Sequence, residues 1–405
     1  MNHLETKNIL TGQQHGFRKH RSCETQLLEF IEEVSTAMER GTTTEAVVLD
    51  FAKAFDRVNH SLLCHKLYHY GIRGKTNSLI ANFLSGRTQS VVVDGVQSSF
   101  VKVKTGVPQG SVLGPCLFLC YINDLPSKIS SPSRLFADDT AVYRFITCAE
   151  DPAKLQEDLQ RLEQWEKEWD MAFHPDKYCV LPFTRSHSPP LSNYTLHGQT
   201  LERVTSTKYL GVILDTKLDF TRHIENICAK ANKTLGFLRR NLKVCSSLTK
   251  MLAYKTMVRP ILEYACTEWD PHSDRLITTL EKVQRRAARF VTNRYHNTTS
   301  VTDMLTLLEW PTLQQRRRCA RLAMLHKILN DQACVSCVGL KRQPRSGRRS
   351  NHSQQLGKIP CRTDYRKFSF FPRTTVDWNS LPSDVVEAPS YNAFCLRAMR
   401  AIQVQ

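Results

Sequence analysis

The chain has 405 residues, of which 41% are hydrophobic and 23% are charged. These proportions are those of a folded globular protein and exclude a disordered chain, and the length allows about two or three domains. Lys and Arg number 56 against 38 Asp and Glu, so the formal net charge is +18. Such an excess of positive charge points to a polyanionic partner, either nucleic acid or an anionic membrane surface.

A membrane partner is the weaker of these two interpretations. The longest apolar stretch, Val112–Ile122, is shorter than the roughly 20 residues that span a bilayer, and the first ten residues are too polar for a signal peptide. We therefore expect no membrane partner, a location in the nucleus and cytoplasm, and reduced cysteines. Cys334-x-x-Cys337 lacks a second pair at zinc-finger spacing, so it does not by itself predict a zinc site.

The first third of the chain has the patterns of β-strands. Thr44–Asp50 is a short apolar run that ends in a carboxylate, as expected of a buried central strand. Gln89–Asp94 and Phe100–Lys104 alternate and are rich in β-branched residues, and Asp94-Gly95 between them is a turn signal. This pattern predicts a hairpin.

Helical patterns follow. Asp151-Pro152 offers an N-cap and a proline in the first turn. The apolar face of an amphipathic helix comes next, with residues spaced by three and four: Leu155, Leu159, Leu162, Trp165 and Trp169. Ranges 220–259 and 275–291 have the same periodicity with basic faces, and 341–357 predicts a linker or basic loop. Mixed elements up to about Asp219 and helices after it predict an α+β domain followed by a helical one.

The positive charge is concentrated in the helical part of the chain. Residues 221–260 hold nine basic residues and one acidic residue, and residues 281–350 hold fifteen basic and four acidic residues. Arg239-Arg240 and Arg285-Arg286 are the best candidates for contacts with nucleic-acid phosphates. A charged face that contacts only solvent is the alternative for any one of these arginines.

Three aspartates are the candidates for chemistry. Asp50 ends a buried strand, where a carboxylate is costly unless it is paired or bound to a cation, although it could instead cap a helix that starts near Ala52. Asp138 and Asp139 are adjacent and repel each other unless a cation neutralises them, and the apolar residues around them disfavour a solvated turn. The pattern of Arg134–Arg144 predicts a hairpin with this pair at its turn. Carboxylate oxygens favour Mg²⁺ or Mn²⁺, and two such ions can hold the oxygens of an in-line phosphoryl displacement.

A further segment, Thr105–Pro115, is rich in Gly and Pro, which fix a sharp backbone path where small side chains let amides approach a ligand. Alone, it is equally explained as a loop that leads into a buried helix.

Together, these segments resemble a known family. VVLDFAKAFD, GVPQGSVLGP, RLFADD and TKYLGVILD, in this order, are similar to the palm motifs of reverse transcriptases. QHGFRKHRSCETQL, FHPDKYCV with the helix before it, LRRNL, RPILEYA, VQRRAARFV and WNSLP resemble the non-LTR (LINE-like) retrotransposon branch, of the jockey or CR1 type. The resemblance runs from about His15 to the C-terminus. It implies a right-hand polymerase fold with a fingers remnant over 1–43, a palm over 44–219 with a fingers-side insert at about 60–105, a helical basic thumb over 220–300, and a basic C-terminal region over 301–405.

The resemblance also implies roles at the nucleotide. Asp50 and Asp138 would bind two metals, with Asp139 as the third carboxylate. Phe51 would offer its backbone carbonyl to a metal, and Phe55 would be the aromatic gate against the ribose 2′-hydroxyl. Gln109 and Gly110 would contact the templating pair or incoming nucleotide. Lys177 would assist the pyrophosphate leaving group. Asp56 would organise the loop rather than bind metal.

At the primer, Tyr209-Leu210-Gly211 would grip the strand. The activity implied is RNA-directed DNA polymerisation with Mg²⁺ or Mn²⁺, in which dNTPs are added to a primer 3′ end, and the partners are an RNA template and a DNA primer or target. Only fourteen residues precede His15, whereas the family's triphosphate-holding fingers segment lies upstream of this point. We therefore expect an N-terminally truncated copy, and the alternative function is a weak or inactive remnant that binds nucleic acid.

Overall fold

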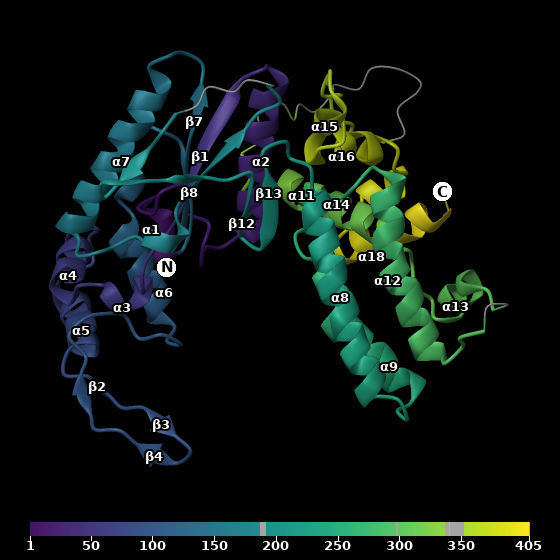
Figure 1. Cartoon of the computed structure of the whole chain (residues 1–405), viewed down its shortest axis with the longest axis horizontal. Coiled ribbons are helices and arrows are strands. Elements are labelled where there is room, and N and C mark those ends of the chain that lie inside the picture. The colour runs from purple at the N-terminus through teal and green to yellow at the C-terminus, as the bar shows by residue number, and fades with distance from the viewer. Residues whose placement is uncertain (187–191, 297–298, 337–339, 341–351, 405) are drawn as a thin grey trace. The chain divides into compact units, whose positions relative to one another are not determined.

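The computed structural model describes residues 1–186, 192–296, 299–336, 340 and 352–404. The chain divides into two compact units (Figure 1). Unit 1 comprises Met1–Gln26 and Gly41–Thr207, and unit 2 comprises Leu27–Arg40 and Lys208–Gln405. Most of the predicted 341–357 loop, and Cys337, lie outside the described residues.

Unit 1 combines a five-stranded sheet with helices and small hairpins. Its strands are β1 Thr43–Asp50, β2 Thr88–Gln89, β3 Val92–Val93, β4 Val96–Gln97, β5 Val101–Lys102, β6 Ser133–Phe136, β7 Asp139–Ile146, β8 Cys179–Phe183, β9 Thr195–Leu196, β10 Gln199–Thr200 and β11 Glu202–Arg203. Its helices are α1 Asn2–Thr6, α3 Ala54–Arg57, α4 His60–His69, α5 Gly74–Leu84, α6 Leu113–Ile122, α7 Asp151–Glu168 and the short 3₁₀ turns η1 Leu125–Lys128 and η2 Pro175–Lys177. This mixture agrees with the predicted α+β class.

The sheet has the strand order β11-β8-β1-β7-β6, and β1 lies at its centre as predicted. β1 pairs antiparallel with β7 and with β8, β6 and β7 form the predicted hairpin, and β11 joins β8 in parallel. Because β1 is buried along nearly its whole length, residues on both of its faces are covered, and it is a continuous apolar run rather than an alternating one. Val47 lies opposite both Val142 and Val180, and this row belongs to the core of unit 1.

Helices α4, α6 and α7 contribute further residues to that core. The predicted amphipathic face of α7 is confirmed, since each of its five apolar residues is at most 9% exposed. The expected N-cap is wrong: α7 begins at Asp151, and Glu150 is its N-cap residue without a side-chain cap. The Asp151 carboxylate instead accepts hydrogen bonds from the backbone amides of Thr147 and Cys148, at 2.8 and 3.0 Å, because the chain leaving β7 folds back over it.

The predicted hairpin after α5 is present as two short ladders, β2 with β5 and β3 with β4 (Figure 1). Asp94 and Gly95 both have positive φ, 49° and 81°, as a tight hairpin turn requires. Every strand residue of this hairpin is exposed.

Unit 2 is almost entirely helical. Two elements cross the division between the units, α2 Cys23–Glu39 and β12 Ser206–Tyr209. The other elements of unit 2 are β13 Val212–Asp215, α8 Thr221–Asn241, α9 Ser247–Ala253, the π-helical turn η3 Tyr254–Val258, α10 Arg259–Glu263, α11 Cys266–Trp269, α12 Asp274–Thr292, α13 Val301–Leu307, α14 Leu313–Leu329, α15 Asp364–Lys367, α16 Phe370–Asn379, α17 Ser383–Val386 and α18 Tyr391–Val404.

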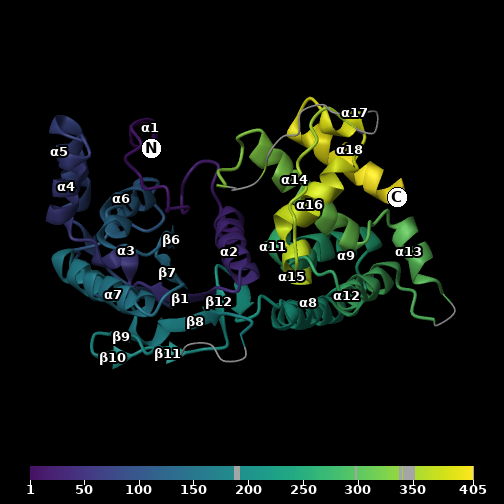
Figure 2. The ribbon, with the colours of Figure 1, turned by 90° about the horizontal axis from the view of Figure 1, so that it is seen from above.

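The core of unit 2 forms where α14 packs against α16 and α18, around the buried Trp378 and Phe394 (Figures 1 and 2). Beside it, Asp270 is almost fully buried and accepts hydrogen bonds from Arg317 and Arg321 at 2.7 and 2.9 Å. Nearby arginines hold the pKa of Asp270 below its usual range against the opposing effect of burial. Within the described ranges, each helix is either too short or too polar to span a lipid bilayer.

Candidate active site at the ends of the central strands

Strand pairing brings the three aspartates together. Asp50 is the last residue of β1 and Asp139 is the first residue of β7, and they lie directly opposite each other in the register. Asp138 lies in the two-residue turn that connects β6 to β7. The helix-capping alternative for Asp50 is wrong, because Lys53 is the N-cap residue of the next helix, α3.

The three carboxylates are partly buried and short of positive charge. Burial raises the pKa of Asp139 to about 6, with further contributions from the charges of Asp138 and Asp50. Burial also raises the pKa of Asp138, and Asp50 adds to this effect. A cluster of carboxylates whose charges are mutually unfavourable is a setting in which a divalent cation is strongly stabilising.

One cation of the protein already reaches this cluster. Lys177, at the end of η2, places its Nζ 2.5 Å from Oδ2 of Asp50, and this bond raises the pKa of the lysine. The backbone amide of His174 donates to the carbonyl of Asp50 at 2.7 Å, which ties the segment before Lys177 to the end of β1. Within the described residues, no three His, Cys, Asp or Glu side chains form a ready-made metal site as they stand. The carboxylates of Asp50, Asp138 and Asp139 nevertheless fit Mg²⁺ or Mn²⁺, because these ions prefer hard oxygen donors.

Aromatic side chains form the support of this site. Phe51 is buried and stacks on Phe173, with ring centroids 4.5 Å apart. Phe55 is partly buried and stacks on Phe118 at the same separation, while Phe17 meets the Phe55 ring edge-on at 6.3 Å. The Phe55 ring therefore has aromatic neighbours on two sides.

The loop before α6 is tied to the segment that follows Asp50. Nε2 of Gln109 donates to the carboxylate of Asp56 at 3.2 Å, and the Thr105 hydroxyl donates to the Asp56 carbonyl at 2.8 Å. Gly106 has a φ of +89°, and a Cβ there would lie 2.8 Å from the Asp56 backbone, so the close approach depends on glycine. Gln109 and Gly110 are both exposed.

The residues predicted to grip a primer lie in unit 2, at the turn between β12 and β13. Tyr209 is 1% exposed and its ring packs against Phe30, with centroids 5.8 Å apart. Leu210 and Gly211 form the turn, with φ of +45° and +85°. The hydroxyl of Tyr264 donates to the Leu210 carbonyl at 3.0 Å, a contact that the sequence motifs do not indicate.

The four predicted phosphate contacts are also in unit 2 and are exposed. Arg239 and Arg240 lie in the last turn of α8, and the Arg239 guanidinium is 5.4 Å from the centroid of the Tyr295 ring. Arg285 and Arg286 lie on α12, and Nη1 of Arg286 donates to Asn232 of α8 at 2.9 Å. These arginines therefore have no acidic partner in the described ion pairs.

Two residues near the aspartates escaped the interpretation of the sequence. The Gln14 side chain accepts a hydrogen bond from the backbone amide of Ala137 at 2.9 Å, and Gly16 lies against the same residue. Both belong to QHGFRKHRSCETQL, whose resemblance to the family implies no role for either residue. The partners are separated by 123 positions, and no periodicity or turn signal joins them.

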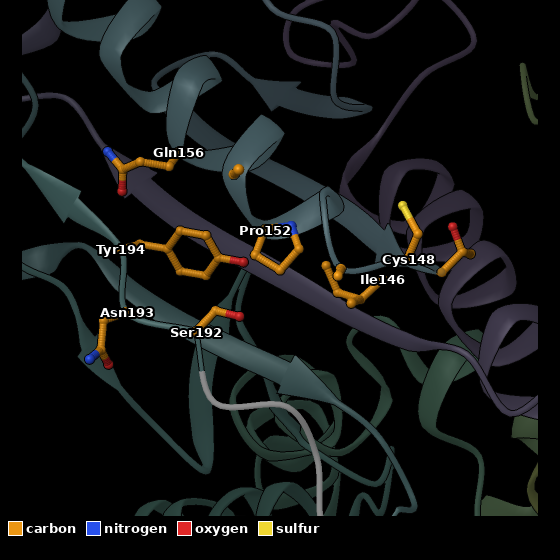
Figure 3. A pocket seen from close by; sticks show the side chains of 10 residues that line it. Ile146, Cys148, Pro152, Gln156, Ser192, Asn193 and Tyr194 are labelled. Carbon is orange, nitrogen blue, oxygen red and sulfur yellow. The ribbon is translucent and has the colours of Figure 1, made fainter.

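A surface pocket of about 830 Å³ lies elsewhere in unit 1 (Figure 3). Its wall includes Ile146, Pro152 and Tyr194. Ile146 pairs with Thr43 at the opposite end of the β1–β7 ladder from Asp50, which is seven residues or roughly 23 Å along the strand. The pocket is thus separate from the aspartates.

Comparison with known proteins identifies relatives among mobile elements. The chain is 30% identical over 299 residues to the "Probable RNA-directed DNA polymerase from transposon X-element" of Drosophila melanogaster, covering 71% of this chain and 33% of that protein. It is 32% identical to the "RNA-directed DNA polymerase from mobile element jockey" of Drosophila funebris, covering 62% and 29%. A third relative, "Probable RNA-directed DNA polymerase from transposon BS" of Drosophila melanogaster, is 29% identical and covers 80% and 38%. The chain thus spans about a third of the length of these relatives.

Among solved structures, apo telomerase from Candida tropicalis matches 82% of this chain and 53% of its own, with a TM-score of 0.44 and 10% identity. The jockey, X-element and BS relatives agree with the predicted resemblance to non-LTR retrotransposons. Residues 1–214 match the family model described as "Reverse transcriptase (RNA-dependent DNA polymerase)". Since this match covers more than half of the chain, the protein belongs to the reverse transcriptase family.

Proposed function

We propose that this chain is an RNA-directed DNA polymerase that extends a primer 3′ end with dNTPs on an RNA template. The observation that carries the proposal is the meeting of Asp50, Asp138 and Asp139 at the adjoining ends of β1 and β7. Polymerisation requires little covalent chemistry from the protein, since positioning and charge stabilisation lower the barrier. Residues 44–219 then act as the palm, 1–43 and about 60–105 as fingers, 220–300 as the thumb, and 301–405 as a basic C-terminal region.

In this proposal the carboxylates hold two Mg²⁺ or Mn²⁺ ions, which when bound stabilise the charge on the attacking and leaving oxygens of the phosphoryl group. Asp50 and Asp138 would bind the two ions, and Asp139 would be the third carboxylate, whose negative charge favours their binding. Lys177 is exposed in its ion pair with Asp50 and would turn from Asp50 toward the departing pyrophosphate. The Phe51 carbonyl would offer a further oxygen to a metal.

Specificity for dNTPs comes from Phe55 in this proposal. Its ring packs against Phe118 and Phe17, and these contacts would keep it beside a ribose 2′-hydroxyl. Gln109 and Gly110 contact the templating pair or the incoming nucleotide from an exposed loop, in which the side chains of Thr105 and Gln109 donate to Asp56. The turn Tyr209-Leu210-Gly211 grips the primer strand.

A primer-extension assay on an RNA template with Mg²⁺ and dNTPs tests the proposal. We expect Asp138→Asn to reduce extension by about a hundredfold or more, because a charge that positions the transition state is lost. Asp94→Asn is the matched control, since Asp94 is exposed in the β3–β4 turn and should be neutral.

If wild type and Asp138→Asn extend the primer equally poorly, the polymerase proposal fails. Equally poor extension with retained binding of template–primer would instead support the second candidate, a nucleic-acid-binding remnant of a polymerase. The exposed arginines of α8 and α12 favour binding in either case.

A further inference from the structure

The segment Gln13–His15 runs alongside the outer edge of β6. The backbone amide of His15 donates to the Leu135 carbonyl at 2.8 Å, and the Leu135 amide donates to the Gln13 carbonyl at 3.0 Å. This segment thus acts as a short additional strand beside β6. It pairs with Leu135, which is two residues before Ala137 in the turn that carries Asp138.

The Gln14 side chain reaches from this segment to the turn itself. Its Oε1 accepts from the Ala137 amide at 2.9 Å and from the Gly16 amide at 2.7 Å. Gln14 is 2% exposed. One buried oxygen therefore binds the segment and the aspartate turn together, immediately before Asp138.

Gly16 makes this approach possible. A Cβ at Gly16 would lie 2.4 Å from the Ala137 nitrogen, which is closer than any side chain can come without displacement. The φ of Gly16 is not positive, so the demand for glycine comes from the contact with the turn.

The turn needs external support. Ala137 is 5% exposed and has a φ of +53°, a conformation that is unfavourable for alanine. Its amide is buried, and a buried amide without an acceptor is destabilising. Gln14 provides that acceptor and so stabilises the backbone conformation from which the Asp138 side chain projects.

Further hydrogen bonds fix the chain just before Gln14. Oδ1 of Asn123 accepts from the Thr11 amide at 2.8 Å, and Nδ2 of Asn123 donates to the Ile9 carbonyl at 2.8 Å. Arg18 donates to the Thr11 carbonyl at 2.6 Å. The segment is thus fixed to the C-terminal end of α6, and this fixes the position from which Gln14 reaches the turn.

The amide of Gln14 carries a cost that simple packing would avoid. Its Nε2 is buried and has no hydrogen-bond partner among the described residues. A methionine of similar length would fill the space without this unsatisfied donor. The glutamine is therefore explained by its oxygen, which acts on the turn.

We propose that Gln14 is a positioning residue that fixes the Asp138 carboxylate for divalent-cation binding, through the Ala137 amide. The inference rests on the proposed function, in which Asp138 binds metal. It assigns a role to QHGF that is separate from any contact with nucleic acid.

The test compares full-length wild type with Gln14→Met, Gln14→Glu and Gly16→Ala. Gln156→Met is the matched control, because Oε1 of Gln156 accepts from the Thr195 amide at 2.8 Å in unit 1 but away from the aspartates. The measurements are the unfolding midpoint, Mn²⁺ affinity by electron paramagnetic resonance, amide hydrogen exchange of residues 134–140, template–primer affinity, and the Mg²⁺ concentration for half-maximal extension.

For Gln14→Met we expect Mn²⁺ affinity to fall about tenfold and the Mg²⁺ requirement to rise by a similar factor. The 134–140 amides should exchange faster, while template–primer affinity stays within about twofold of wild type. Gly16→Ala should reproduce these changes by displacing the turn. Gln14→Glu keeps an oxygen acceptor and should bind Mn²⁺ at least as tightly as wild type.

Unchanged Mn²⁺ affinity in folded Gln14→Met would overturn the inference. Loss of folding in Gln14→Met would also overturn it, since the side chain would then support the fold rather than the carboxylate. A fall in Mn²⁺ affinity in Gln14→Glu as large as that in Gln14→Met would overturn it as well. If wild type binds Mn²⁺ normally but does not extend a primer, the proposed function fails while the Mn²⁺ comparison still decides the role of Gln14.

Discussion

Asp139 is a carboxylic acid whose charge the folded protein disfavours. Its pKa is raised to about 6, first by burial and then by Asp138 and Asp50, whereas an aspartate in an unfolded chain has a pKa of about 3.9. Because the folded pKa is the higher one, the stabilising contribution of this group is complete below about pH 4 and is lost as pH rises through about 6. Such a cost to stability is typical of a functional site.

Asp139→Asn should therefore stabilise the protein at pH 7.5 in the absence of divalent cations. We expect a gain on the order of 1 kcal/mol in the free energy of unfolding, after allowing for solvent screening of a partly exposed group. The gain should shrink near pH 4, and added Mg²⁺ should stabilise wild type more than the variant. Urea denaturation at both pH values, with and without Mg²⁺, measures this; an equal gain at pH 4 would contradict the charge argument.

At the scale of an element, the β12–β13 turn depends on a helix that follows much later in the chain. Gly211 has a φ of +85°, and a Cβ there would lie 2.8 Å from Cε1 of Tyr264. Tyr264 follows α10, and Nε1 of Trp269 donates to its carbonyl at 2.9 Å. Residues at the ends of α10 and α11 thus support the turn of the proposed primer grip.

Gly211→Ala should destabilise the protein by about 1–3 kcal/mol from the positive φ alone, with an additional cost from the contact with Tyr264. Gly198→Ala separates the two effects, because Gly198 has a φ of +72° and open space around it. The change at Gly211 should therefore cost more than the change at Gly198. In the double variant with Tyr264→Ala the two losses should be less than additive; strict additivity in chemical denaturation would show that ring and turn do not interact.

At the scale of the whole molecule, the basic residues behind the +18 net charge differ in whether an acidic side chain already pairs with them. In unit 1, Lys128 and Lys154 lie 3.6 and 3.7 Å from glutamate oxygens. Arg239 and Arg240 are exposed at the end of α8 without a described acidic partner. Positive charge that is not already paired is the part that can replace counterions on a nucleic acid.

Replacing Arg239 and Arg240 with Ala should weaken template–primer binding and flatten its salt dependence. If both arginines contact phosphates, the slope of log affinity against log salt should fall by about 2. Lys128→Ala with Lys154→Ala removes the same charge from paired positions and should leave the slope nearly unchanged. Equal slopes for the two double variants, measured by fluorescence anisotropy, would show that net charge rather than these arginines governs binding.

The local elements of this protein follow from its sequence. The apolar run of Thr44–Asp50, the turn signal at Asp94-Gly95 and the periodicity of α7 each predict the element observed, because strand, turn and helix preferences act over a few neighbouring residues. The β6–β7 hairpin is likewise predicted, and it has Asp138 in its turn and Asp139 as the first residue of β7. The motif order further indicates the reverse transcriptase family, to which the chain belongs. The roles of individual residues in catalysis stay predictions.

The tertiary structure decided what those local elements surround. The register that sets Asp50 opposite Asp139, the ion pair of Asp50 with Lys177 and the bond from Ala137 to Gln14 join residues that are 89, 127 and 123 positions apart. Hydrogen bonds at such separations depend on how the packed chain returns on itself, and that path leaves no periodicity or turn signal in the sequence.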